Sequence, residues 1–129
     1  MNIKLNKLFE KNFLVEKQHS AKNMKSGDLE VLATPSLVAF MEQVSKEYLN
    51  TFLEDGCGSV GINININHIA PTLIGKTVLV KGCVKEIIKE KIIIFSLEAF
   101  ENNKKIGDAN HTRAIIDNKK FMKKLLDNN

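Results

Sequence analysis

Tryptophan is absent from this chain of 129 residues, arginine occurs once, and cysteine and proline occur twice each. The two cysteines, Cys57 and Cys83, do not form a CxxC pair, and two thiols are too few for a disulfide scaffold in a domain of this size. We therefore expect both to be packing residues. The histidines His19, His68 and His111 lie far apart without the spacing of metal ligands, so no metal site is predicted.

Long apolar runs are also absent. No stretch of about 18 consecutive apolar residues occurs, which argues against a membrane-spanning helix. The N-terminal sequence, MNIKLNKLFEKNF, lacks the continuous apolar core of a secretory signal. A cytoplasmic location without membrane contact is therefore the expectation.

The positive charge shows little of the pattern that nucleic-acid binding requires. The formal net charge is +4 and the pI is near 9.1, but the lysines are scattered over predicted turns and the C-terminal end, as at 104–105, 119–120 and 123–124. Arg113 is the only arginine, and no basic segment is interleaved with aromatic residues. We expect a solvated lysine surface and no nucleic-acid partner, although the excess charge can attract an anionic ligand.

What the chain does contain is enough apolar sequence for one core. Its hydrophobic content is 43%, without any segment of disordered composition. A chain of this length suits one compact domain of ordinary size. We expect residues 1–129 to form a single domain.

A strong helix start lies at Thr34 and Pro35, because threonine can cap a helix and proline fits its first position. Apolar residues then recur at three- and four-residue steps, which predicts a helix from about 35 to 53 with one broad buried face. The residues of this face are Leu37, Val38, Met41, Val44, Tyr48 and Leu49. Glu42 lies at or beside the buried face, where a carboxylate requires an explanation.

After the helix the apolar period changes to two. The sequence SVGINININHI, at 59–69, places Val60 and three isoleucines on one face of a strand and Gly61 and three asparagines on the other. Further strands are predicted over 11–19, 77–88, 92–100 and 105–117, and a short amphipathic helix over 118–126. The last three strands follow one another through short turns and so predict an antiparallel meander. One apolar helix against a curved antiparallel sheet is an α+β arrangement.

Three sequence blocks resemble a known family. They are ATPSLVAFME at 33–42, GINININHIAPT at 61–72 and GDANHTRAIID at 107–117. In order and spacing they are similar to the hot-dog thioesterase family that includes fluoroacetyl-CoA thioesterase. The resemblance implies a hot-dog fold, in which an antiparallel sheet wraps around one long central helix.

The resemblance also implies a set of site residues. Thr34, Glu42 and His68 take the family's catalytic positions, and Gly61 and Arg113 its substrate-binding positions. Hot-dog proteins pair through their sheets and build their sites between protomers, so a homodimer is implied, with a tetramer as a further option. On this basis we expect His68 to approach from a different subunit than Thr34 and Glu42.

Each of these residues also has a plainer interpretation. Thr34 could only cap the helix, and the glutamate eight residues later could be an ordinary solvated side chain. His68 could be a core or strand-end histidine, and Gly61 could mark a bulge or bend. An exposed strand face would account for His111 and Arg113.

Together, however, the residues suit thioester hydrolysis, which needs a nucleophile or activated water, a base and oxyanion stabilisation. Glu42 could activate water or attack the thioester itself, and Thr34 could position the water or act as the nucleophile. His68 suits proton exchange with the leaving thiolate near neutral pH. No cofactor is implied, because coenzyme A is part of the substrate, and Arg113 with nearby lysines is a candidate contact for its phosphates.

We therefore predict an acyl-CoA thioesterase acting on a small or medium acyl group. Residues 28–30, Asp-Leu-Glu, stand where a selective member of the family could place an aromatic lid, so specificity for a fluorinated acyl group is not supported. One alternative is a non-catalytic acyl-CoA-binding module that keeps the pocket but not the chemistry. A hot-dog hydratase or dehydratase is a weaker alternative, because no D-x-N-P-x-H-like stretch occurs.

Overall fold

A computed structural model describes all 129 residues and confirms the predicted order of one strand, a long helix and four further strands. The elements are β1 (Phe9–Leu14), the 3-10 helix η1 (Lys17–His19), α1 (Ala21–Met24), α2 (Thr34–Asn50), β2 (Cys57–His68), β3 (Thr77–Ile88), β4 (Ile92–Glu101), β5 (Lys104–Asp117) and α3 (Asn118–Asp127). No helix is both long and apolar enough to cross a membrane.

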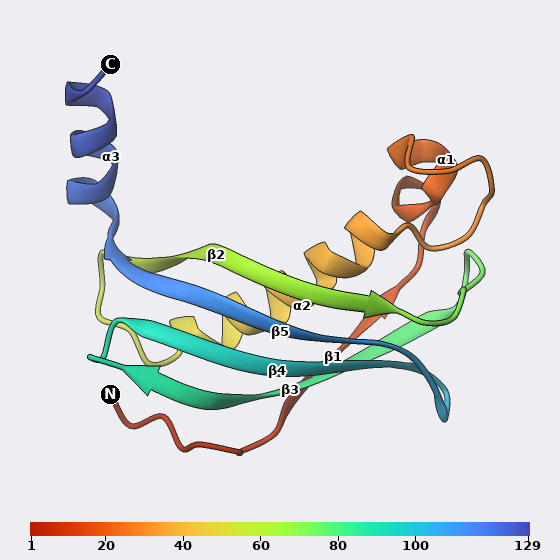
Figure 1. The fold of residues 1–129 in the computed structure, drawn as a ribbon, viewed down its shortest axis with the longest axis horizontal. Coiled ribbons are helices and arrows are strands. Elements are labelled where there is room, and N and C mark those ends of the chain that lie inside the picture. The colour runs from red at the N-terminus through yellow and green to blue at the C-terminus, as the bar shows by residue number, and fades with distance from the viewer.

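All five strands form one antiparallel sheet in the order β1-β3-β4-β5-β2. The hairpins from β3 through β5 confirm the predicted meander. On its other side, β5 pairs with β2. Figure 1 shows α2 lying across one face of the sheet, α1 near the end of β2, and α3 projecting from the opposite end. Because β1 and β2 are the edges of the sheet, each leaves one side without a strand partner.

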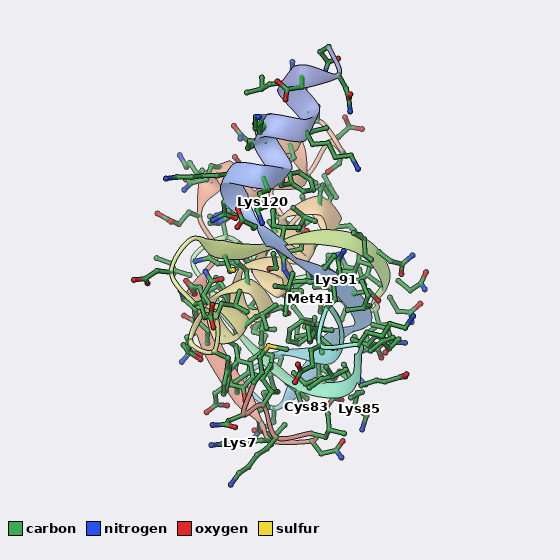
Figure 2. The ribbon with its side chains drawn as sticks, turned by 90° about the vertical axis from the view of Figure 1, so that its left-hand side faces the viewer. Lys7, Met41, Cys83, Lys85, Lys91 and Lys120 are labelled. Carbon is green, nitrogen blue, oxygen red and sulfur yellow. The ribbon has the colours of Figure 1, made fainter.

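The core lies between α2 and the sheet. Leu37, Met41, Val44 and Leu49 are buried on the predicted face of α2 and pack against strand residues of the sheet. Figure 2 shows Met41 within the body of the molecule and Lys7 and Lys85 toward its lower edge. Phe40, which the periodicity analysis did not include, is also buried.

The N-terminal region differs from the prediction in its boundaries. β1 begins and ends earlier than the predicted strand 11–19, because the chain leaves the sheet after Leu14 and turns into η1. Phe13 and Val15 are nevertheless both buried, as their alternation predicted. The segment 21–32 contains the single-turn helix α1 followed by a loop, in agreement with the predicted loop or short helical lid.

A bulge in β2 changes which residues face the helix. Gly61 pairs with Arg113 and Asn63 with Thr112, so Ile62 is an extra residue in the ladder. The alternation is displaced by one at this point. Gly61 therefore faces α2 and Ile62 is 55% exposed, which corrects the prediction that the isoleucine faces inward and the glycine outward.

Candidate active site

The first part of the site is a hydroxyl–imidazole pair at the N-terminus of α2. Thr34 is the first residue of α2 and His68 is the last residue of β2. Thr34 Oγ1 and His68 Nδ1 are 2.8 Å apart, a hydrogen-bond distance. Residues far apart in the sequence are thus brought together within one chain.

Thr34 does not cap its own helix, contrary to one of its predicted roles. Ala33 occupies the N-cap position, and no side chain caps this end of α2. The exposed Thr34 side chain instead makes its hydrogen bond with His68. Its hydroxyl is therefore available for chemistry, in the arrangement of an oxygen nucleophile beside its base.

The environment of His68 favours a neutral imidazole. Burial lowers the pKa of His68 from its ordinary value, and the nearby backbone of Ala70 opposes the shift in part. The second ring nitrogen, Nε2, is buried and has no hydrogen-bond partner in the protein. A neutral imidazole can accept the proton of the Thr34 hydroxyl, as a general base must.

This pKa shift predicts that His68 titrates at a lower pH than an ordinary histidine. In an NMR titration we expect His68 to protonate below pH 6.5, its ordinary value, because the buried ring takes up a proton less readily than the unfolded chain does. The free energy of unfolding should then fall as the pH drops below the ordinary value and His68 becomes protonated in the unfolded state. The protein unfolded in urea is the control, and a folded-state midpoint at or above 6.5 would contradict the prediction.

A pocket of about 330 Å³ opens beside this pair. Thr34 and His68 line it, together with residues of α1, of the loop before α2 and of the chain after β2: Ala21, Ser26, Val31, Leu32, Ala33, Ile69, Ala70 and Pro71. The lining is mostly apolar and contains no Phe, Tyr or Trp. An uncharged, compact group would fit here next to the hydroxyl and the imidazole.

The second part of the site surrounds Glu42. A Cβ added to Gly61 would lie 2.8 Å from Glu42 Oε2 and 3.3 Å from Arg113 Nη1. Glycine at position 61 therefore leaves the space in which the carboxylate and the guanidinium approach each other. Arg113 Nη1 and Glu42 Oε2 are 3.9 Å apart, and the Glu42 side chain is 42% exposed. Glu42 is thus neither buried nor fully solvated.

His111 and Arg113 are not on an exposed face, as the simpler interpretation of their alternation suggested. Their residues are only 1% and 6% exposed, because odd-numbered residues of this part of β5 point toward α2. The Arg113 guanidinium is turned inward and contacts Ser59, His111 and Glu42. It is therefore not available as the surface contact for CoA phosphates that the sequence suggested.

Within one chain the two parts are separate. Glu42 lies eight residues after Thr34 on α2, which at 1.5 Å per residue is about 12 Å along the helix axis. Thr34 and His68 therefore form one group, and Glu42, Gly61 and Arg113 form another. The expectation that His68 reaches Thr34 from another subunit is wrong, because their hydrogen bond is made inside the chain.

The fold defines the class of protein. A long helix on an antiparallel sheet is shared with a solved structure of the fluoroacetyl-CoA thioesterase FlK. That structure matches with a TM-score of 0.92 at 25% identity and covers 100% of this chain and 99% of its own. A variant of FlK solved with fluoroacetate and CoA matches with a TM-score of 0.86 at 26% identity, over 92% of this chain and 99% of its own.

A hot-dog-like protein from Thermanaerovibrio acidaminovorans matches the fold with a TM-score of 0.86 at 18% identity, over 98% of this chain and 93% of its own. The fluoroacetyl-CoA thioesterase of Streptantibioticus cattleyicolor is 32% identical over 96 residues, which are 74% of this chain and 68% of that protein. The sequence profile of the fluoroacetyl-CoA-specific thioesterase family matches residues 15–119. The chain belongs to this family. The predictions of a hot-dog fold and of a thioester hydrolase are confirmed.

Proposed function

We propose that this protein hydrolyses small or medium acyl-CoA thioesters, using Thr34 and His68 of one protomer together with Glu42 of its partner. The observation that carries the proposal is the 2.8 Å contact between Thr34 Oγ1 and His68 Nδ1 at the mouth of a pocket. Thioester hydrolysis requires an activated oxygen beside the acyl carbonyl, and this pair can supply it.

The first chemical step is addition of the Thr34 oxygen to the thioester carbonyl while neutral His68 accepts the hydroxyl proton. Collapse of the tetrahedral intermediate breaks the C–S bond, and His68 returns the proton to the departing CoA thiolate. Water then cleaves the acyl–threonine ester and releases the free acid. Glu42 accepts a proton from this water as the water adds to the ester carbonyl, and it gives that proton to the Thr34 oxygen when the tetrahedral intermediate collapses, which regenerates the Thr34 hydroxyl and the Glu42 carboxylate.

The proposed homodimer forms through β2. This twelve-residue strand pairs only with β5, and it exposes Ile62 at the bulge. A long unpaired edge is a template for pairing with another chain. Two copies related by a two-fold axis would join their β2 strands antiparallel and extend the sheet across both protomers.

Antiparallel pairing would also complete the site. It reverses one β2 strand relative to the other, so that the end of one strand, at His68, approaches the first half of its partner, where Gly61 lies. Thr34 and His68 of one protomer would then face Glu42 of the other. The separation of the two groups within one chain supports this arrangement.

The pocket supports the choice of a small or medium acyl group. Its volume of about 330 Å³ is near the lower end of the roughly 300–1,000 Å³ that is usual for ligand pockets. Neither its lining nor the exposed residues Asp28, Leu29 and Glu30 include a Phe, Tyr or Trp side chain. We therefore propose no specific preference for a fluorinated acyl group, although the related thioesterases are named for fluoroacetyl-CoA.

We propose a cytoplasmic location for this activity. The two free cysteines are consistent with the reducing conditions of the cytoplasm.

The test is hydrolysis of acyl-CoA thioesters from acetyl to long-chain, including fluoroacetyl-CoA, with the released thiol followed by absorbance. We expect turnover to be greatest for small or medium acyl groups, and acetyl-CoA and fluoroacetyl-CoA to differ by less than about tenfold in kcat/KM. Thr34→Val, which keeps the shape of the side chain but removes its hydroxyl, should abolish most of this activity.

Two outcomes would contradict the proposal. Turnover in Thr34→Val equal to that of the wild type would remove threonine from the mechanism. Tight binding of acyl-CoA without turnover by the wild type would instead favour the acyl-CoA-binding module, which remains the second candidate because the pocket does not itself require chemistry.

A further inference from the structure

The Arg113 guanidinium is fixed by hydrogen bonds to residues other than Glu42. Its Nε donates a hydrogen bond to Ser59 Oγ at 2.8 Å and its Nη2 donates to the Ser59 carbonyl at 3.1 Å. Its Nη1 lies 3.1 Å from His111 Nε2. Three different nitrogens of the guanidinium are thus fixed by two residues on neighbouring strands, and only Nη1 approaches Glu42.

The hydrogen bonds of His111 determine its tautomer. His111 Nδ1 is 2.8 Å from the carbonyl oxygen of Asn63, and a carbonyl can only accept, so Nδ1 carries the proton. Nε2 of the neutral ring is then an acceptor and receives a hydrogen bond from Arg113. A protonated His111 would turn an N–H toward the guanidinium, with two positive charges in contact.

The surroundings of His111 keep it neutral. Burial is the largest cause that lowers the pKa of His111, and the Arg113 charge adds to it, while the Asn63 carbonyl and the Glu42 carboxylate oppose the shift. Phe95 of β4 stacks on the ring, with centroids 6.2 Å apart. The charged side chains that act on the ring are therefore Arg113 and Glu42.

The distance between Arg113 and Glu42 is the informative feature. At 3.9 Å the pair attracts electrostatically, but the guanidinium does not donate a hydrogen bond to the carboxylate. An unrestrained arginine beside a carboxylate commonly forms a two-pronged hydrogen-bonded pair. Such a pair would occupy the lone pairs that Glu42 needs to accept a proton from water.

We propose that His111 and Ser59 are positioning residues that hold the Arg113 guanidinium back from Glu42. The positive charge then attracts the carboxylate, but the lone pairs of the carboxylate stay free to accept a proton. This inference rests on the proposed role of Glu42 in hydrolysis. His111 accepts a hydrogen bond from Nη1, the nitrogen closest to the carboxylate, and Ser59 anchors the other side of the guanidinium. Neither residue lines the pocket beside Thr34 and His68.

The activity test compares His111→Leu with His111→Gln. Leucine removes the acceptor for Arg113, whereas glutamine can place an amide oxygen in its position. We expect kcat to fall by about tenfold or more in His111→Leu, with KM changed by less than about twofold because the acyl pocket is untouched. His111→Gln should recover most of the lost kcat. Asn110→Leu, on the exposed face of the same strand, is the control and should behave as the wild type.

A second measurement does not depend on activity. In ¹⁵N NMR spectra of the wild type at pH 6.5, the ordinary pKa of histidine, and above, we expect His111 mainly as the neutral tautomer with hydrogen on Nδ1. We also expect a slowly exchanging Arg113 Nε–H signal that shifts or broadens in His111→Leu. Hydrogen on Nε2 of His111, or an unchanged Arg113 signal in His111→Leu, would overturn the positioning role.

These readouts separate the inference from the proposed function. If Glu42→Gln retained full activity, the proposed function would fail, but the NMR signals would still decide whether His111 positions Arg113. If Glu42→Gln is inactive while His111→Leu and His111→Gln lose kcat equally and in proportion to their loss of thermal stability, the histidine is structural only. In that case the inference fails and the proposed function stands.

Discussion

Glu42→Gln is expected to lower kcat for acyl-CoA hydrolysis by on the order of 100- to 10,000-fold, the usual contribution of a general base. Glutamine keeps the size of the side chain but cannot accept the proton of the attacking water. The acyl group should remain on Thr34, so intact-protein mass spectrometry of the variant mixed with substrate should show an acyl adduct. The adduct should be absent when Thr34→Val is added to the variant.

Glu47→Gln provides the matched control on the same helix. Glu47 pairs with Lys11 at 2.6 Å, and this hydrogen bond is the largest cause that lowers the pKa of Glu47. Because both side chains are partly exposed, the change should cost less than about 1 kcal/mol of stability and leave kcat unchanged. An inactive Glu42→Gln without an acyl adduct would point to direct attack by water, and an active one would remove Glu42 from the mechanism.

The sequence predicted the elements of this fold well because apolar periodicity is a local property. The strand 77–88 is found with the predicted boundaries, and 92–100 and 105–117 differ from β4 and β5 by one residue each. The predicted main helix ends at residue 53, three residues beyond Asn50, where α2 ends. Helix ends depend on the hydrogen bonds of single residues and are the least predictable part of such patterns.

The sequence could not predict which side chains of β2 face the helix. SVGINININHI alternates perfectly in its letters, and nothing in it indicates that one residue is extra. The bulge arises from pairing with β5, where Gly61 lies opposite Arg113 and Asn63 opposite Thr112. As a result Gly61 and His68, an odd- and an even-numbered residue, both face α2.

The same limit applied to the polar cluster around Arg113. Alternation along β5 correctly put His111 and Arg113 on one face, but it could not tell whether that face was buried. The decisive fact is that Ser59, Gly61 and Glu42, from two other elements, converge on this face. The resemblance to the family identified Glu42, Gly61 and Arg113, whereas His111 and Ser59 become visible only through their contacts in the structure.

A mixed dimer should recover activity from two inactive parents. We expect a heterodimer of one Thr34→Val chain and one Glu42→Gln chain, co-expressed with different tags and purified through both, to show about half of the wild-type kcat per dimer. Each proposed site takes Thr34 and His68 from one protomer and Glu42 from the other. One site of the heterodimer therefore collects both substitutions, and the second site contains none.

A heterodimer of Thr34→Val and His68→Gln chains is the decisive comparison. Thr34 and His68 are hydrogen-bonded within one chain, so each site of this heterodimer keeps one damaged member of the pair and should remain inactive. If His68 instead served the partner's Thr34, this heterodimer would recover activity. If only the heterodimer of Thr34→Val and Glu42→Gln chains recovers activity, one protomer supplies Thr34 and His68 to each active site and the other protomer supplies Glu42. No recovery in either heterodimer would mean that Glu42 acts within its own chain, and the β2-paired site would have to be abandoned.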